Sequence, residues 1–377
     1  MKKKIFILLI ALICSLSIIS CNIPLTTTEN SGVQSSSETV TSSSKYNDFI
    51  EDCFPTPDVQ VEKTESGLEV ALNEDGETYT LYGVGDFSEE DLIVPSHYNG
   101  LPIISIGEYA FYQCNFIKTV TLSNEIKVIG FSAFLGCSAL ESITISNSVK
   151  EIHTTAIAAC PLLTTIYIPS SVEYINTYAF DSNTNLISII VDSENEYYQS
   201  IDGNLYSKSG TELIQYATGK TDNEFIIPDG VITILGRAFA DCIYLESVFI
   251  PSSVIEIEQG AFRECHGLSN VTFGNDSKLE IINGSMFFGC VSLESIYLPD
   301  NVKRLGSGVF WGCTSLKEIY MGENVVYFGQ HLLHQCYALE KIVFRGTESK
   351  WNAIEKDSLW QVHANQNYKL IFDKNDK

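Results

Sequence analysis

Short runs of alternating apolar and polar residues recur between residues 92 and 342. In Leu140-Glu141-Ser142-Ile143-Thr144-Ile145, we expect Leu and Ile to point inward and Ser142 and Thr144 to point outward. This alternation is typical of a half-buried strand. A Pro-Ser-Ser or Asn-Ser turn and a V-x-x-I-G stretch follow, which predicts a short second strand on the opposite wall. The unit ends with A-F-x-x-C-x-x-L, whose three-residue spacing predicts one helical turn.

This unit returns with a fixed period, which eight cysteines mark. Within the two groups of cysteines, five of the six intervals are 23 residues long, and one is 25. Such a period is typical of a solenoid, in which each copy covers the apolar side of the next. Nine copies must stack in parallel around one continuous interior, because a full crossover follows every strand. The marking residues are Cys114, Cys137, Cys160, Cys242, Cys265, Cys290, Cys313 and Cys336.

The repeated motif I-P-S-S-V-x-x-I-x-x-x-A-F-x-x-C-x-x-L-x-x-I resembles the BspA-type (Treponema-type) leucine-rich repeat family. The resemblance covers residues 92–342 and is broken by one insertion. Its departures are local: Asn183 stands at a cysteine position, Ile157 and Leu333 stand near the phenylalanine position, and Gly284-Ser285-Met286 replaces Gly-Ala-Phe. The predicted fold class is an α/β solenoid of leucine-rich-repeat type, with parallel strands, short helical turns and about nine 23-residue repeats.

The segments outside the repeats predict caps, an insertion and a leader. Residues 67–82 read as a hairpin that caps the first repeat, and Trp351 and Trp360 are large enough to cover the last one. The expected organisation is a signal peptide (1–20), a lipidated Cys with a Ser/Thr-rich tether (21–46), an N-terminal cap with a hairpin (47–91), repeats 1–4 (92–189), an insertion or variant repeat (190–224), repeats 5–9 (225–342) and a C-terminal cap (343–377).

The first residues predict export and a lipid anchor. Lys2–Lys4 precede the apolar run Ile5–Ile13, and Ile18-Ile19-Ser20-Cys21 resembles the lipobox of bacterial lipoproteins. Acylation of Cys21 would hold the protein at the extracellular face of a bacterial membrane. An uncleaved anchor and a secreted protein are the alternatives. The membrane is therefore expected as a partner only through the N-terminal lipid.

The net charge of the chain further limits the classes of partner that it can bind. The formal net charge of the chain is −24, and removing the leader with its three lysines makes it −27. Such a charge repels phosphate backbones, so nucleic acid is excluded as a partner. The charge is explained by solubility or, as an alternative, by a dependence on divalent cations. The sequence does not fix the oligomeric state.

The regularly spaced cysteines are predicted to be buried free thiols rather than disulfide partners or metal ligands. Neighbouring rungs of a parallel stack lie about 4.8 Å apart, whereas the Cβ atoms of a disulfide lie about 3.5–4.5 Å apart. Metal binding favours closely paired cysteines, and the sequence has no C-x-x-C. His331 and His334 share a predicted helical face but lack the Glu of a zincin motif. We therefore expect no enzyme activity, no metal and no cofactor.

One outward position of the predicted strand carries large apolar side chains in several copies. Aligned Tyr, Phe and Ile on a solvated face favour a surface that binds an extracellular protein or glycan. The alternative is packing within the sheet, in a structural envelope scaffold that has no dissociable ligand. The resemblance implies adhesion, because the family includes surface proteins implicated in binding to host matrix and to other cells. The position holds Thr121, Thr144, Tyr167, Ile190, Phe249, Thr272, Tyr297, Tyr320 and Val343, and the binding candidates are Tyr167, Ile190, Phe249, Tyr297 and Tyr320.

Overall fold

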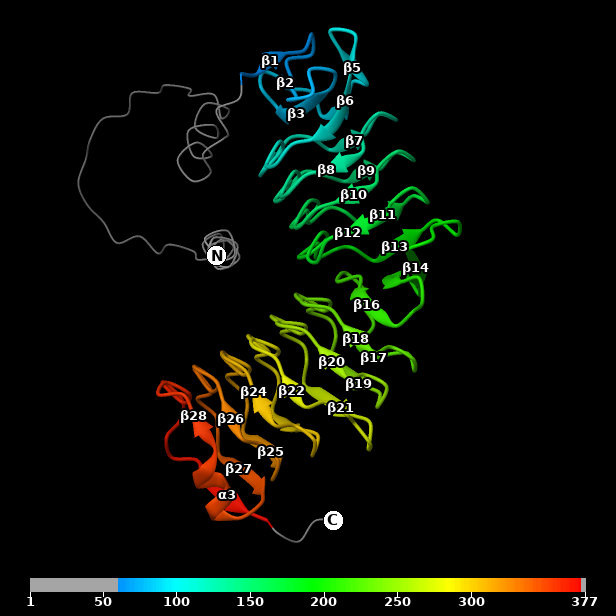
Figure 1. Ribbon diagram of the computed structural model, residues 1–377. Helices are drawn as coiled ribbons and strands as arrows, with labels where there is room; N and C mark the ends of the chain where they lie inside the picture. Colours follow the sequence, from blue (N-terminus) through cyan, green and yellow to red (C-terminus); the bar gives the residue numbers. More distant parts are fainter. Residues whose placement is uncertain (1–59, 374–377) are drawn as a thin grey trace, which may run out of the picture. The chain divides into compact units, whose positions relative to one another are not determined.

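The computed structural model describes residues 60–373 (Figure 1). The chain divides into two units, residues 1–58 and 59–377. The predicted signal peptide, Cys21 and the tether lie outside the described residues, and everything below concerns the second unit. In that unit the strands form the successive turns of a stack, which runs from the N-terminal to the C-terminal end of the chain in Figure 1.

The described residues form a parallel β-solenoid, as the period predicts, but with about twelve turns instead of nine. Each turn contributes one longer strand to what we call the long-strand wall. The nine predicted copies begin nine of these strands, and β13, β27 and β29 are additional because they close the two runs. The strands are β4 (Asp91–Ile93), β7 (Thr119–Thr121), β9 (Ser142–Thr144), β11 (Thr165–Ile168), β13 (Ser188–Val191), β17 (Glu224–Ile226), β19 (Ser247–Ile250), β21 (Asn270–Phe273), β23 (Ser295–Tyr297), β25 (Glu318–Gly322), β27 (Lys341–Arg345) and β29 (Lys369–Phe372).

The V-x-x-I-G stretches form a second parallel wall, the short-strand wall. Its strands pair in register, for example Ile129 with Ile152 and Ile152 with Ile175. Their inward isoleucines and leucines are buried. The strands are β6 (Leu101–Ile106), β8 (Val128–Ile129), β10 (Glu151–Ile152), β12 (Tyr174–Ile175), β16 (Glu212–Gln215), β18 (Thr233–Ile234), β20 (Glu256–Ile257), β22 (Ile281–Ile282), β24 (Arg304–Leu305), β26 (Tyr327–Phe328) and β28 (Glu355–Lys356).

The predicted helical turns are wrong, and so is the α/β class. The A-F-x-x-C segments are turns in which alternate amides bond in different directions. The N–H of Phe134 donates to Ala156 O of the next turn (2.8 Å), whereas the N–H of Leu135 donates to Ser132 O three residues back (3.2 Å). Ser132 has a φ of +53°, in the left-handed region that ends an α-helix. The three-residue spacing therefore comes from β-turns, which form a third wall, the turn wall.

One helix exists among residues 60–373, α3 (Glu348–Ala353), and it belongs to the C-terminal cap. Thr347 caps its first turn by accepting a hydrogen bond from the N–H of Lys350 (3.2 Å). Trp351 and Trp360 lie against Phe328 with ring centroids 5.6 and 5.1 Å away. The helix has six residues, far fewer than the number needed to cross a bilayer.

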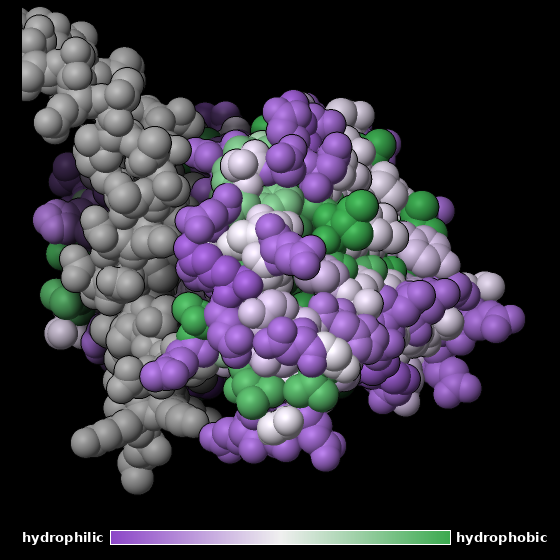
Figure 2. Space-filling view, turned by 90° about the horizontal axis from the view of Figure 1, so that it is seen from above, coloured by the Kyte–Doolittle hydropathy of each residue, from purple (hydrophilic) through white to green (hydrophobic). Residues whose placement is uncertain are grey.

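Antiparallel strand pairs cover the N-terminal end of the solenoid. The hairpin expected in residues 67–82 is formed by β2 (Glu69–Leu72) and β3 (Tyr79–Gly83), which pair antiparallel. The flanking β1 (Glu62–Lys63) pairs with β2, and β3 continues the short-strand wall by pairing with β6. A further short strand, β5 (His97–Tyr98), pairs with β6. Figure 2 looks down on this end and shows hydrophilic residues interspersed with small, separate hydrophobic patches, as expected for a solvent-facing cap.

The interior is divided in two, so the prediction of one continuous interior is wrong. Residues 198–215 form a meander in which β14 (Tyr198–Ile201) pairs antiparallel with β15 (Asn204–Ser207), and β15 with β16. Successive side chains of a strand point to opposite faces. Leu205 accordingly belongs to the core cluster of the first run and Tyr206 to that of the second. The meander therefore separates two apolar interiors and closes both.

Candidate binding surface

The outer column is the row of side chains that point outward from the middle of the long-strand wall. Parallel pairing places them side by side: Tyr167 next to Ile190, Ile226 next to Phe249, and Tyr297 next to Tyr320. Their inward neighbours are buried or half-buried, so the strand alternation forces the column outward. Its members are Ile93, Thr121, Thr144, Tyr167 and Ile190 in the first run, and Ile226, Phe249, Thr272, Tyr297, Tyr320, Val343 and Ile371 in the second.

The predicted candidates differ in how far they are exposed. Tyr167, Ile190, Phe249 and Tyr297 are exposed, and Tyr297 has 59% of its surface accessible. Tyr320 is only half-buried, however. Val343, which we expected on the solvated face, is 7% exposed, between Tyr320 and Ile371 of the two neighbouring strands. The column is therefore most accessible before its C-terminal end.

Sequence reasoning missed the two most exposed apolar members. Ile93 is 75% exposed and Ile226 is 71% exposed. Both lie in the first strand of their run, ahead of the copies that were aligned for this position. The signal was present, because Leu92-Ile93-Val94-Pro95 and Phe225-Ile226-Ile227-Pro228 match the apolar-x-apolar-Pro pattern around Tyr167 and Phe249. Aligning the first strand of each run would have found them.

Two of the three tyrosines of the column donate hydrogen bonds to neighbouring carboxylates. Tyr167 donates a hydrogen bond to Asp192 (2.6 Å), which raises the pKa of Tyr167 and lowers the pKa of Asp192. Tyr320 donates to Glu318 (2.6 Å), which raises the pKa of Tyr320 to about 12. The rings of Tyr297 and Tyr320 stack with centroids 4.0 Å apart and planes 9° apart. Tyr297 and Tyr320 thus form a continuous stacked aromatic surface.

Charged side chains flank the outer column, and several of them form ion pairs. Lys118 pairs with Glu90 at 2.7 Å, Lys317 with Glu294 at 2.9 Å, and Lys341 with Glu318 at 2.9 Å. The partners of each pair lie in neighbouring turns. In the middle of the wall, Glu224 and Glu246 form no ion pair with any residue of the described range 60–373.

The family described as BspA type leucine rich repeat region matches residues 104–222 and 232–361, in six copies. The chain belongs to the BspA-type leucine-rich repeat family. The resemblance found in the repeated motif is thus confirmed. It is a family not known as enzymes. No curated protein matches the sequence.

Three similar solved structures support the solenoid fold. A leucine rich cell surface protein from Faecalibacterium prausnitzii is 27% identical, with 80% of this chain and 99% of that chain covered and a TM-score of 0.57. The pneumococcal vaccine antigen PcpA is 20% identical, with 85% and 100% covered and a TM-score of 0.66. A leucine-rich repeat protein from Eubacterium ventriosum is 21% identical, with 82% and 96% covered and a TM-score of 0.53. The last two likenesses concern the fold alone.

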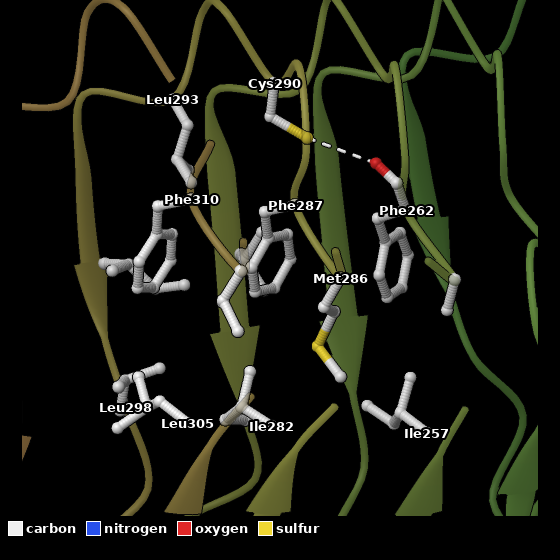
Figure 3. Packing of buried hydrophobic residues seen from close by; sticks show 14 of the residues in the cluster. Ile257, Phe262, Ile282, Met286, Phe287, Cys290, Leu293, Leu298, Leu305 and Phe310 are labelled. Atoms are coloured by element: carbon white, nitrogen blue, oxygen red, sulfur yellow. Dashed lines mark hydrogen bonds between the residues drawn. The ribbon is translucent and has the colours of Figure 1, made fainter. Parts of the chain in front are cut away.

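The repeated cysteines of the BspA-type units lie in the interior. All eight are buried and free of disulfides. Most donate a hydrogen bond from Sγ to a carbonyl of the preceding turn, such as Cys290 to Phe262 O at 3.1 Å (Figure 3). Asn183 does the same with its amide, which donates to Ile157 O at 2.7 Å. Burial raises the pKa of Cys290 and Cys313 well above the usual range of a thiol.

These thiols are expected to resist alkylation in the native protein, because all eight are buried and out of reach of the reagent. Iodoacetamide should modify none of the eight in native buffer and all of them in guanidinium chloride. Mass spectrometry of peptides that contain Cys137, Cys290 and Cys313 measures this directly. Rapid native modification of any of these cysteines would show that its turn opens, and would contradict the packing described here.

Three histidines gather at the C-terminal end of the turn wall. His331 and His334 lie in one turn, with ring centroids 5.5 Å apart, and His363 of the cap lies 5.0 Å from His334. The predicted shared helical face does not exist, since this segment is a turn. His334 also packs on Trp311 at 4.4 Å. Within residues 60–373 no group of His, Cys, Asp and Glu is arranged to hold a metal ion.

Proposed function

We propose that the protein is a cell-surface binding protein that recognises an extracellular protein or glycan through its outer column. The observation that carries this proposal is the accessibility of large apolar side chains at one register position, including Ile93, Ile226 and Tyr297. Aligned apolar groups on an ordered surface are typical of interfaces. The relative from Faecalibacterium prausnitzii, described as a cell surface protein, supports the location.

The outer column is tested with a variant that carries Tyr167→Ala, Ile226→Ala, Phe249→Ala and Tyr297→Ala. We expect capture of the full-length protein by a panel of extracellular matrix proteins and bacterial surface glycans to weaken by about tenfold or more. Removing exposed side chains leaves the core intact, so the melting temperature should change little. Surface plasmon resonance and thermal unfolding measure the two effects. The matched control is Ile255→Ala, which removes an exposed isoleucine next to β20 on the short-strand wall.

The alternative function is a structural scaffold of the envelope without a dissociable ligand. The stacking of Tyr297 on Tyr320 and the burial of Val343 favour it, because they show part of the column packing within the wall. Under this alternative the fourfold variant loses stability and its capture by the panel stays unchanged. That outcome would replace the binding proposal.

We further propose that Cys21 carries the lipid that tethers the protein to the outside of the membrane. The supporting observation is the lipobox-like segment Ile18-Ile19-Ser20-Cys21 after an apolar run. Cys21→Ser is expected to abolish incorporation of a labelled fatty acid and to move the protein out of the membrane fraction. Cys53→Ser is the control and should leave both unchanged. Undiminished labelling of the Cys21→Ser protein would refute the anchor.

A further inference from the structure

The central strands β17 and β19 carry a patch in which apolar and acidic side chains lie together. We call Glu224, Ile226, Glu246 and Phe249 the β17–β19 patch, and all four are exposed. Register places Ile226 beside Phe249 and Glu224 beside Ser247. The N–H of Glu246 bonds to Asn223 O (2.8 Å), so Glu246 lies next to the start of β17. Two apolar groups are thus bordered by two carboxylates.

The two carboxylates of the patch lack the neutralising partners found elsewhere on the long-strand wall. Glu90, Glu294 and Glu318 each form an ion pair with a lysine of the next turn. Glu141 and Glu340 lack such a contact, but Lys118 and Lys317 interact electrostatically with them. Within residues 60–373, Glu224 and Glu246 have neither kind of partner. The patch therefore offers unused negative charge beside exposed apolar surface.

Charge and shape together select the occupant. A second copy is disfavoured, because two chains of net charge −24 repel each other and the patch has no cation to offer. Acidic glycans are repelled in the same way. A neutral sugar ring gains from flat aromatic faces, whereas Ile226, the more exposed of the two apolar members of the patch, is aliphatic. A cationic side chain next to an apolar one satisfies both features of the patch.

We propose that the β17–β19 patch docks an extended segment of a partner protein in which a Lys or Arg and an apolar residue are two positions apart. Residues two apart lie on one face of an extended chain, as Glu224 and Ile226 do here. The cation then pairs with Glu224 or Glu246, and the apolar side chain packs on Ile226 and Phe249. This inference rests on the proposed binding function of the outer column and names the chemistry of its partner.

The test uses fluorescein-labelled peptides and the full-length protein. The probe contains Lys-Ser-Phe units separated by Gly-Ser; one comparison peptide has Phe replaced by Ser, and another has Lys replaced by Glu. Fluorescence anisotropy near physiological ionic strength measures the affinities. We expect the probe to bind at least about tenfold more tightly than either comparison peptide. Equal affinity for the probe and the Phe-to-Ser peptide would overturn the proposal, because it would reveal attraction by bulk charge alone.

Variants locate the contact. Glu224→Gln with Glu246→Gln, and separately Ile226→Ser, should each weaken probe binding by about tenfold. The matched control is Glu141→Gln with Glu340→Gln, which removes the same charge from the same wall and should alter affinity by less than about twofold. If both double variants weaken binding equally, the proposal is overturned.

Failure of this inference is distinguishable from failure of the proposed function. If the fourfold outer-column variant loses capture by the matrix and glycan panel while Glu224→Gln/Glu246→Gln binds probe and panel normally, the binding function stands and the cationic partner is wrong. If the fourfold variant keeps full capture, the binding function itself is wrong. Loss of probe binding in both the carboxylate variant and Ile226→Ser supports the inference.

Discussion

Replacing Arg237 with alanine is expected to lower the free energy of unfolding by about 3 kcal/mol, because it leaves a buried carboxylate without its counter-charge. Arg237 Nε lies 2.6 Å from Asp181 Oδ2, and the two side chains are 24% and 10% exposed. Ser182 donates a further hydrogen bond to Asp241 (2.6 Å). These contacts join the turn walls of the two runs across the meander. The partial exposure of Arg237 places the expected loss at the lower end for buried pairs.

The loss should depend on pH with a definite sign. Burial raises the pKa of Asp181 even with Arg237 present. Without the guanidinium, that pKa rises further, and a carboxyl whose folded pKa exceeds its unfolded pKa destabilises the fold as pH rises. The Arg237→Ala deficit is therefore expected to be larger at pH 8 than near pH 5. Urea unfolding at the two pH values measures it.

Two further variants separate charge from packing at this junction. Asp181→Asn in the Arg237→Ala background removes the uncompensated charge and should restore part of the lost stability. Arg304→Ala removes an exposed arginine that stacks on Tyr327 at 4.0 Å and should cost much less. A deficit that is equal at both pH values and unaffected by Asp181→Asn would show that Arg237 acts through its packing alone.

The strands were predictable because their cause is local and repeated. Alternation around Ile143 and Ile166 fixes which side chains enter the core, and the period fixes the stacking. The period also determines many ion pairs. Lys150 and Glu173 are 23 residues apart in the sequence, and Lys150 Nζ lies 2.5 Å from Glu173 Oε1. Any lysine and glutamate separated by one period on an outer face become neighbours, so such pairs can be read from the sequence alone.

The turn wall was not predictable because two structures share its spacing. A helical turn and a β-turn both bring residues three apart together. The deciding feature is the left-handed backbone at positions such as Ser132, Thr155 and His331, with φ between 53° and 55°. These residue types ordinarily occupy right-handed regions, so the sequence gives little indication of the left-handed conformation. Hydrogen bonds to the next turn hold them there, and this is tertiary information.

The divided interior and the unpaired carboxylates escaped prediction for a related reason. Leu205-Tyr206 is a run without alternation, which is typical of a strand buried on both faces. The sequence does not say that one face belongs to each core. Similarly, Glu224 lies in β17, the first strand of the sheet β17-β19-β21, so no regular repeat precedes it in that sheet. Both features arise where the repeat is interrupted, and the period gives no guidance there.

The interrupted interior leads to the second large expected effect. Phe287 is fully buried and packs between Phe262 and Phe310, with ring centroids 5.8 and 5.9 Å away (Figure 3). Phe287→Ala should lower the free energy of unfolding by about 3–5 kcal/mol, because it removes a buried ring and leaves a cavity. The neighbouring Phe288 is half-buried against Arg263. Phe288→Ala is therefore the matched control and should cost less than half as much.

The same variant tests whether the meander separates two cooperative units. In a repeat array each turn contacts only its neighbours, so damage stays local unless the cores are coupled. Phe287 belongs to the second core cluster, whereas Phe134 belongs to the first. Hydrogen exchange should therefore show that Phe287→Ala reduces protection in residues 225–342 and leaves residues 92–189 close to wild type. Equal loss of protection in both runs would show that the meander transmits unfolding, and that the two interiors behave as one.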